Sequence, residues 1–221
     1  KKKIIMSQII KNKEEIIKYF EKGSKPKKLW KIGTEHEKFL YDLNTFHPIN
    51  YNDKNGIRPL FKLLKKKGWK EIIEDKNTIA LKNRRSTISL EPRCQIELSG
   101  STVKTIHQTC KEAKTYLDQL KQICTKKNLG ILGIGYYPKN FKKNIGWVPK
   151  KRYSIMKKKM RKTGSHGLDM MTSTCCIQTN IDYENENDMF KKVRIGFALQ
   201  PFITALFANS PIINKKKSKF L

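Results

Sequence analysis

Arginine and acidic residues are both scarce in this 221-residue chain, although lysine is abundant. Only 7 of the 48 basic side chains are arginine, and 19 acidic residues leave a formal net charge of +29. Arginine binds phosphates and guanine edges through paired N–H donors, whereas lysine is a flexible point charge. The low share of arginine therefore argues against a specific nucleic-acid partner. The lysines are also spread over the whole chain. A basic polyanion- or nucleic-acid-binding protein stays open as an alternative class.

Two further absences limit the class of protein. The five cysteines are odd in number and form no Cys-x-x-Cys pair, so the sequence predicts neither a disulfide framework nor a zinc site. No apolar run reaches the length of a membrane-spanning helix, and residues 1–5 do not lead into the apolar stretch of a signal peptide. We therefore expect reduced thiols, a cytoplasmic protein and no membrane partner.

The chain does contain amphipathic segments separated by polar turns. Apolar spacing predicts helices over 7–22, 57–67, 103–126, 152–160 and 188–209. Alternating or β-rich runs predict strands within 32–39, 78–99, 129–137 and 175–182. The 103–126 helix is expected to be capped by residues 99–102 and to carry the apolar stripe Ile106, Cys110, Ala113, Leu117, Leu120 and Cys124. This pattern predicts an α+β fold with a mostly antiparallel sheet, helices on its apolar face and a cleft on its polar face.

Polar side chains recur on one face of three of these predicted strands. Glu35 and Glu37 point the same way, because side chains two residues apart on a strand share a face. The later strands repeat the pattern with Glu91, Glu97, Gln178 and Asn180. Carboxylates side by side repel unless a cation neutralises them, and Mg²⁺ takes oxygen ligands. The residues alone leave two other interpretations open: a charged surface strand, and strands that are never neighbours.

Seven motifs follow one another in a fixed order along the chain. Ile-Gly-Thr-Glu-His-Glu-Lys-Phe at 32–39 comes first, and the second, at 90–100, contains both Leu-Glu-Pro and Gln-Ile-Glu-Leu-Ser-Gly. The third is His-Gln-Thr-Cys at 107–110. Further motifs lie at 149–156, 167–171, 178–182 and 198–211. This series resembles the glutamate–cysteine ligase family of the plant and proteobacterial type. The similarity is collinear from about residue 30 to 221, which makes it more specific than any single motif.

The resemblance implies a glutamine-synthetase-like catalytic fold and an ATP-dependent ligase. In that family the γ-carboxyl of L-glutamate is joined to L-cysteine through a γ-glutamyl phosphate, the first step of glutathione biosynthesis, with Mg²⁺ bridging carboxylates and phosphates. By motif match, the catalytic and metal-binding residues are Glu35, Glu37 and Glu97. The residues expected to contact substrate or ATP are Gln178, Asn180, Arg152 and Arg161.

The chain departs from the family pattern in two ways. Arg93-Cys94 stands where relatives carry Gly-Gly, and relatives are longer than this chain. The resemblance therefore implies that residues 1–221 are the N-terminal portion of a single catalytic domain. We expect exposed apolar surface, no activity of this portion alone, and a complementing C-terminal fragment or a homodimer as partner. A carboxylate–amine ligase with another amine substrate is the neighbouring alternative.

Overall fold

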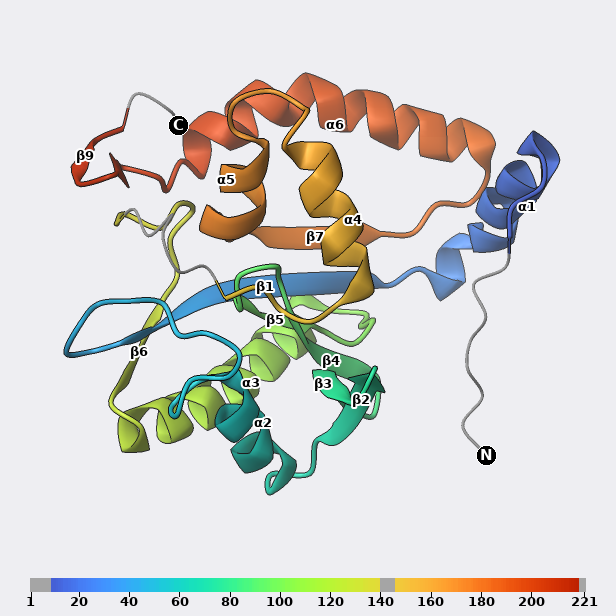
Figure 1. Cartoon of the computed structure of the whole chain (residues 1–221). Helices are drawn as coiled ribbons and strands as arrows, with labels where there is room; N and C mark the ends of the chain where they lie inside the picture. Colours follow the sequence, from blue (N-terminus) through green and yellow to red (C-terminus); the bar gives the residue numbers. More distant parts are fainter. Residues whose placement is uncertain (1–8, 140–145, 219–221) are drawn as a thin grey trace.

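The strand that carries Glu35 and Glu37 is paired on both edges and lies one strand from the end of the sheet. It is β1 (Ile32–Asp42), in a computed structural model that describes residues 9–139 and 146–218 (Figure 1). β1 pairs along one edge with β5 (Ile96–Ser99). Its other edge is shared, because the first half pairs with β7 (Ile177–Ile181) and the second half with β6 (Leu129–Leu132). All pairings among the described strands are antiparallel, as predicted.

Three further strands extend the sheet beyond β5. The order is β2-β3-β4-β5-β1-β6, with β4 at Ser86–Leu90, β3 at Asn77–Asn83 and β2 at Lys70–Glu74. The sequence did not predict β2. Apolar and polar residues do not alternate through this strand, because Ile72 and Ile73 are adjacent at the point where its register with β3 shifts. A separate two-stranded hairpin near the C-terminus joins β8 (Ile212–Ile213) and β9 (Lys216–Lys217).

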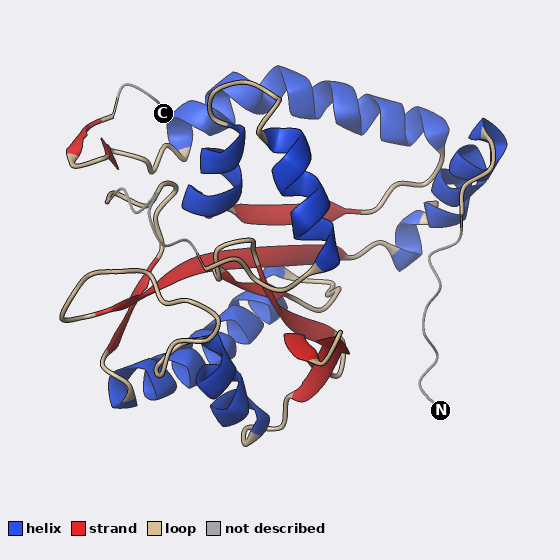
Figure 2. Cartoon of the chain, viewed as in Figure 1, coloured by secondary structure: helices blue, strands red, loops and turns tan. Residues whose placement is uncertain are grey.

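The main core lies between the sheet and two helices, α2 (Ile57–Lys65) and α3 (Ile106–Lys126), which Figure 2 shows together below β1. Leu64 of α2 and Leu120 of α3 are both fully buried in it. The start of α3 differs from the expectation that residues 99–102 cap it. Thr105 is the cap instead. Its side chain accepts a hydrogen bond from the Gln108 backbone N–H, and the Gln108 side chain accepts one from the Thr105 backbone N–H.

The buried side of α3 is rotated relative to the predicted stripe. Leu120 and Cys124 are buried as expected, but Ile106 is 61% exposed and Cys110 is also exposed. The side chains that are buried on this helix are Thr109, Tyr116, Leu120, Ile123 and Cys124. The first half of α3 is held by polar contacts instead, since the Glu112 carboxylate accepts hydrogen bonds from the Ser86 hydroxyl and the Ser101 backbone N–H.

The remaining helices are α1 (Lys13–Gly23), the short 3-10 turn η1 (Lys27–Leu29), α4 (Lys151–Met160), α5 (Gly167–Ser173) and α6 (Glu186–Leu206). The helix expected over 7–22 begins at Lys13, because the Asn12 side chain caps it; residues 7 and 8 lie outside the described residues. In Figure 1, α4, α5 and α6 lie above β1 and α2 and α3 below it, so helices are not confined to one side. Across the described residues, no helix combines the length and apolar character needed to cross a membrane.

The predicted exposed apolar surface is present on β7 and α6. α6 has no buried residue although much of it is apolar. We call this surface the α6–β7 apolar surface, and its large side chains are Ile177, Ile181, Phe190, Val193, Ile195, Phe197, Leu199, Phe202, Ile203, Leu206 and Phe207. Phe197 is 72% exposed and Phe202 is 71% exposed. Exposed apolar side chains in this number indicate an interaction site on a folded protein.

Candidate functional site

The three strands that carry the predicted site are neighbours in the sheet. β1 lies between β5 and β7, and the register places Glu37 opposite Glu97 and Glu35 opposite Gln178. The interpretation in which these strands never meet is therefore wrong. Directly opposite residues of an antiparallel pair share a face of the sheet. We call this polar surface the acidic face, and it consists of Glu35, Glu37, Glu97, Gln178 and Asn180.

The two amides of β7 hold the carboxylates of β1. The Asn180 Nδ2 group donates to Glu35 Oε1 at 2.8 Å, and the Gln178 Nε2 group donates to Glu37 Oε1 at 3.3 Å. The second oxygen of Glu37 accepts the backbone N–H of Cys176 at 3.0 Å. Both glutamates are thus fixed in place by β7, so the acidic face has a defined geometry.

Glu37 and Glu97 are buried carboxylates that lie directly opposite each other on the adjacent strands β1 and β5. Glu37 is 8% exposed and Glu97 is 7% exposed, which excludes the interpretation of a charged surface strand for this pair. Glu97 accepts a hydrogen bond from the Ser99 hydroxyl. Burial raises the pKa of Glu37 above its usual value and the Glu97 charge adds to this, against the hydrogen bonds from Cys176. A cation at this position would relieve the repulsion.

Glu91 adds a fourth carboxyl group that the sequence reasoning left out of the site. The chain reverses directly after β4, where the backbone N–H of Glu91 bonds to the Gln95 carbonyl at 2.9 Å. Burial raises the pKa of Glu91 to about 7, with further contributions from the Glu97 and Glu37 charges. The alternation of 88–99 had already placed Glu91 with Glu97, and this signal was sufficient to find it.

The Glu91 carboxyl predicts a fall in stability as pH rises. Its pKa of about 7 lies above the usual value of 4.5, so the folded chain keeps a proton that the unfolded chain loses. The associated stabilisation is complete below pH 4.5 and is lost as pH rises through about 7. We expect Glu91→Gln to flatten the pH dependence of the free energy of unfolding in this window, measured by urea titration in metal-free buffer. Glu14→Gln, at an exposed helix position, is the control, and an unchanged slope in Glu91→Gln would contradict the assignment.

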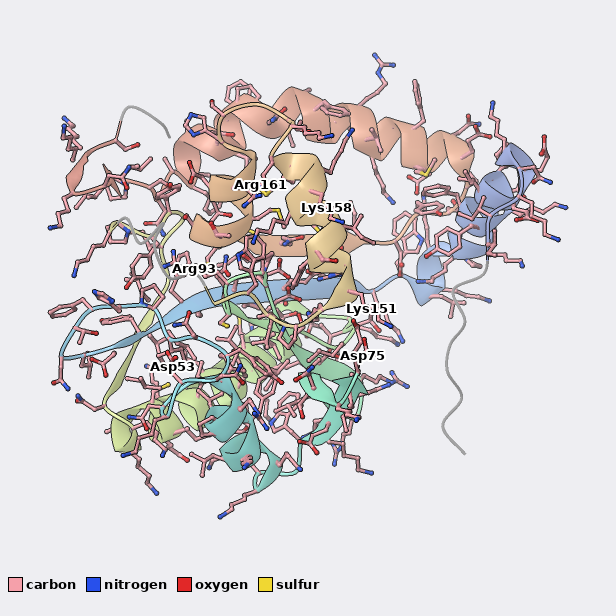
Figure 3. The ribbon with its side chains drawn as sticks, viewed as in Figure 1. Asp53, Asp75, Arg93, Lys151, Lys158 and Arg161 are labelled. Carbon is pink, nitrogen blue, oxygen red and sulfur yellow. The ribbon has the colours of Figure 1, made fainter. Side chains whose placement is uncertain are left out.

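The two arginines predicted to meet anions lie in different places. The Arg152 Nη2 atom lies 3.7 Å from Glu91 Oε1, beside the acidic face. Lys150 lies near the same carboxyl, and burial lowers its pKa to about 8. Arg161, at the C-terminal end of α4, lines a separate cavity that contains none of the acidic-face residues. The structure thus brings Arg152 to the Glu91 carboxyl, whereas Arg161 lies at the other end of α4. Figure 3 labels Arg161 at that end and Lys151 at the start of the helix.

A cavity of about 740 Å³ opens beside Glu37, where β6 and β7 separate along the shared edge of β1. Lys38 lies at this fork, and Cys175 and Cys176 line the cavity from the segment that leads into β7. The end of α6 closes the far side with Phe207. Its volume falls in the range of small-molecule sites, and Glu37 is the acidic-face residue that lines it.

The donor chemistry of the acidic face fits a hard divalent cation, because it offers carboxylate and amide oxygens. Within residues 9–139 and 146–218, however, no group of three or more His, Cys, Asp or Glu side chains is arranged to hold a metal ion. In the structure the oxygens of Glu35, Glu37 and Glu97 accept hydrogen bonds from Asn180, Cys176, Gln178 and Ser99. A cation would have to replace some of these bonds.

The fold and the site define an α+β protein in which an antiparallel sheet gathers carboxylates and amides on one face, with a ligand-sized cavity beside Glu37. Comparison with known proteins identifies its family. Residues 31–221 match the glutamate–cysteine ligase family 2 (GCS2), and this chain belongs to that family. It is 46% identical over 209 residues to glutamate–cysteine ligase A, chloroplastic, of Oryza sativa subsp. japonica. It is 46% identical over 213 residues to glutamate–cysteine ligase, chloroplastic, of Medicago truncatula and 44% identical to that of Arabidopsis thaliana.

These alignments cover 95% of this chain but only 42%, 41% and 40% of the rice, Medicago and Arabidopsis relatives. They also correct the expectation of a cytoplasmic protein, since the relatives are named as chloroplastic. The sequence argument failed because cysteine usage separates reducing from oxidising compartments and does not distinguish one reducing compartment from another.

Proposed function

We propose that this chain provides one wall of the active site of an ATP-dependent glutamate–cysteine ligase. In the proposed reaction the γ-carboxylate of L-glutamate attacks the terminal phosphorus of ATP and releases ADP. The amine of L-cysteine then attacks the γ-glutamyl phosphate, expels phosphate and leaves γ-glutamylcysteine, the first intermediate of glutathione biosynthesis. The observation that carries this proposal is the pairing of β5, β1 and β7, which gathers the carboxylates and amides of three separate family motifs on one face.

Each element of the acidic face has a role in this proposal. Mg²⁺ is the proposed cofactor, held by Glu35, Glu37 and Glu97, and it supplies neutralisation of the charge on the phosphates. Gln178 and Asn180 position the β1 carboxylates, as their hydrogen bonds to Glu37 and Glu35 indicate. The partly enclosed cavity beside Glu37 would limit the access of water to the acyl phosphate.

The proposed partner is a second polypeptide segment that covers the α6–β7 apolar surface. This surface adjoins the cavity, because Ile177, Ile203 and Phe207 belong to both. A segment packed there would therefore also complete the walls around Glu37. A complementing C-terminal fragment or a second copy of the chain would fit this surface. The part of the rice relative that lies outside the match is the segment used in the assay of the proposed function.

An ADP-release assay with L-glutamate, L-cysteine and Mg²⁺ tests the proposed function. We expect the chain co-expressed with the unmatched portion of the rice relative to release ADP only when cysteine is present, and the chain by itself to release little. Replacing cysteine with other amino acids as the amine tests the alternative of a different carboxylate–amine ligase. Absence of any amine-dependent ADP release from the completed protein would sink the ligase proposal.

A further inference from the structure

One edge of β7 is left without a partner strand in the part of the chain that the structure describes (Figure 2). We call it the free edge, and all five residues of Ile177–Ile181 are exposed. Edge strands of folded proteins are usually protected from pairing by lysine, proline or a β-bulge. β7 contains no charged residue and no proline, although the chain has 48 basic residues, and its register with β1 is regular. The free edge is therefore open to another strand.

The register with β1 shows which backbone groups point to the free edge. The Glu37 N–H donates to the Cys176 carbonyl at 3.1 Å, so the Cys176 carbonyl points toward β1. Backbone N–H and C=O groups of an antiparallel strand point to its two edges at alternate residues. Gln178 and Asn180 therefore share the orientation of Cys176 and bond to β1. The residues whose backbone groups point outward, here called the outer residues, are Ile177, Thr179 and Ile181.

The side chains of the outer residues are largely uncovered. They lie on the face of the sheet opposite the acidic face, since Ile177 pairs with His36. Ile177 is 66% exposed and Ile181 is 59% exposed. The end of α6 lines the cavity beside Glu37 together with Ile177 and Thr179, yet α6 buries none of its own residues. The cavity therefore borders both the free edge and α6.

Backbone hydrogen bonding decides which kind of segment fits this edge. A helix satisfies its own backbone groups, so a helix packed here would bury the outward N–H and C=O groups without partners, which is unfavourable. An added strand pairs with these groups and covers the apolar side chains at the same time. We propose that the free edge of β7 is a strand-addition site for an extended segment of the remainder of the ligase. The origin of the segment rests on the proposed function, whereas its strand conformation follows from the edge.

Strand addition gives the partner segment a place in the site. Side chains alternate between the two faces of a sheet, so every second residue of the added strand lies on the acidic face beside Gln178 and Asn180. The residues between them lie on the opposite face, and we expect these to be apolar because they adjoin Ile177 and Ile181. The remainder of the ligase therefore supplies side chains to the acidic face itself.

Amide hydrogen exchange followed by NMR tests the pairing residue by residue. The chain alone is compared with its complex, co-expressed with the unmatched portion of the rice relative. In the chain alone we expect the outer residues to exchange rapidly and Gln178 and Asn180 slowly, because only the latter bond to β1. In the complex the exchange of the Thr179 N–H should slow by about a hundredfold or more.

Thr179→Pro removes one outward N–H and no bond to β1, and proline is tolerated at edge positions of this kind. We expect it to weaken the association by about tenfold or more, measured as the rice portion that a tagged chain retains. Thr179→Val keeps the N–H and the shape of the side chain, so it is the matched control and should retain as much as the parent. If Thr179→Pro does not fold, the exchange of Thr179 in the unaltered chain decides the question.

Association without slowed exchange at Thr179 would overturn strand addition and leave the proposed function standing, since only side chains would then dock. No association, or equal losses in the two variants, would overturn it as well. Slowed exchange in the complex without ADP release would contradict the proposed function alone. Ile-Gln-Thr-Asn-Ile places similar side chains in both directions, so a second copy is the competing occupant. Slowed exchange that appears in the chain alone as its concentration rises would assign the edge to that second copy and overturn the proposal.

Discussion

Glu37→Gln should lower the cysteine-dependent kcat of the completed ligase by about a hundredfold or more, since a cation held at this carboxylate supplies several kcal/mol of charge stabilisation. Glutamine has the same shape but carries no charge. It keeps an oxygen for the Cys176 backbone N–H and removes the repulsion between the Glu37 and Glu97 carboxylates. The measurement is ADP release at saturating ATP over a range of Mg²⁺ concentrations.

Stability separates this effect from simple misfolding. Because Glu37 is buried beside Glu97, we expect the free energy of unfolding of Glu37→Gln to be equal to or higher than that of the parent chain. Glu14→Gln, on the exposed side of α1, should keep full activity. Full turnover in a folded Glu37→Gln protein would refute the role of this carboxylate, whereas loss of both turnover and stability would indicate a structural role.

Leu120→Ala should destabilise the chain by about 3 kcal/mol, the usual cost of truncating a leucine that is enclosed on all sides. Leu120 is fully buried between α3 and the sheet, so the substitution removes apolar contacts and leaves a cavity. Urea unfolding followed by circular dichroism gives the free energy, and the midpoint should fall with little change in the slope.

Ile106→Ala is the matched control, because the sequence pattern assigns both residues to one stripe of the same helix. Ile106 is 61% exposed in the structure, so its truncation should cost less than about 1 kcal/mol. Equal losses for the two variants would mean that α3 packs along the predicted stripe and that its observed rotation is wrong.

These two residues also show where sequence reasoning stops. Alternation along β1 was enough to put Glu35 and Glu37 on one face, because a strand has only two faces. The face of a helix is less determined: α3 turns Tyr116 and Ile123 inward, and the sequence cannot show that Glu112 holds its first half through Ser86 and Ser101. Strand β2 escaped prediction for a similar local reason, the register shift at Ile72.

The residues of the acidic face could also be predicted from the sequence, but the position of Arg161 could not. The facing of Glu37 and Glu97 and the hydrogen bonds from Gln178 and Asn180 follow from strand pairing that the motifs suggested. The position of Arg161 did not follow, because charge and order along the chain say nothing about which side of α4 meets which cavity. Distances between elements that are far apart in sequence are set by packing.

The shared edge of β1 has a consequence for the order of events during synthesis. β1 ends at residue 42, yet its partners β5 and β7 end at residues 99 and 181. At about 5–20 residues per second, both of its edges stay without a partner for several seconds, and the β7 edge for about ten seconds or more. During that time the open edges of β1 can pair with other chains, and the charged side chains of Glu35, Glu37 and Lys38 on this strand oppose such pairing.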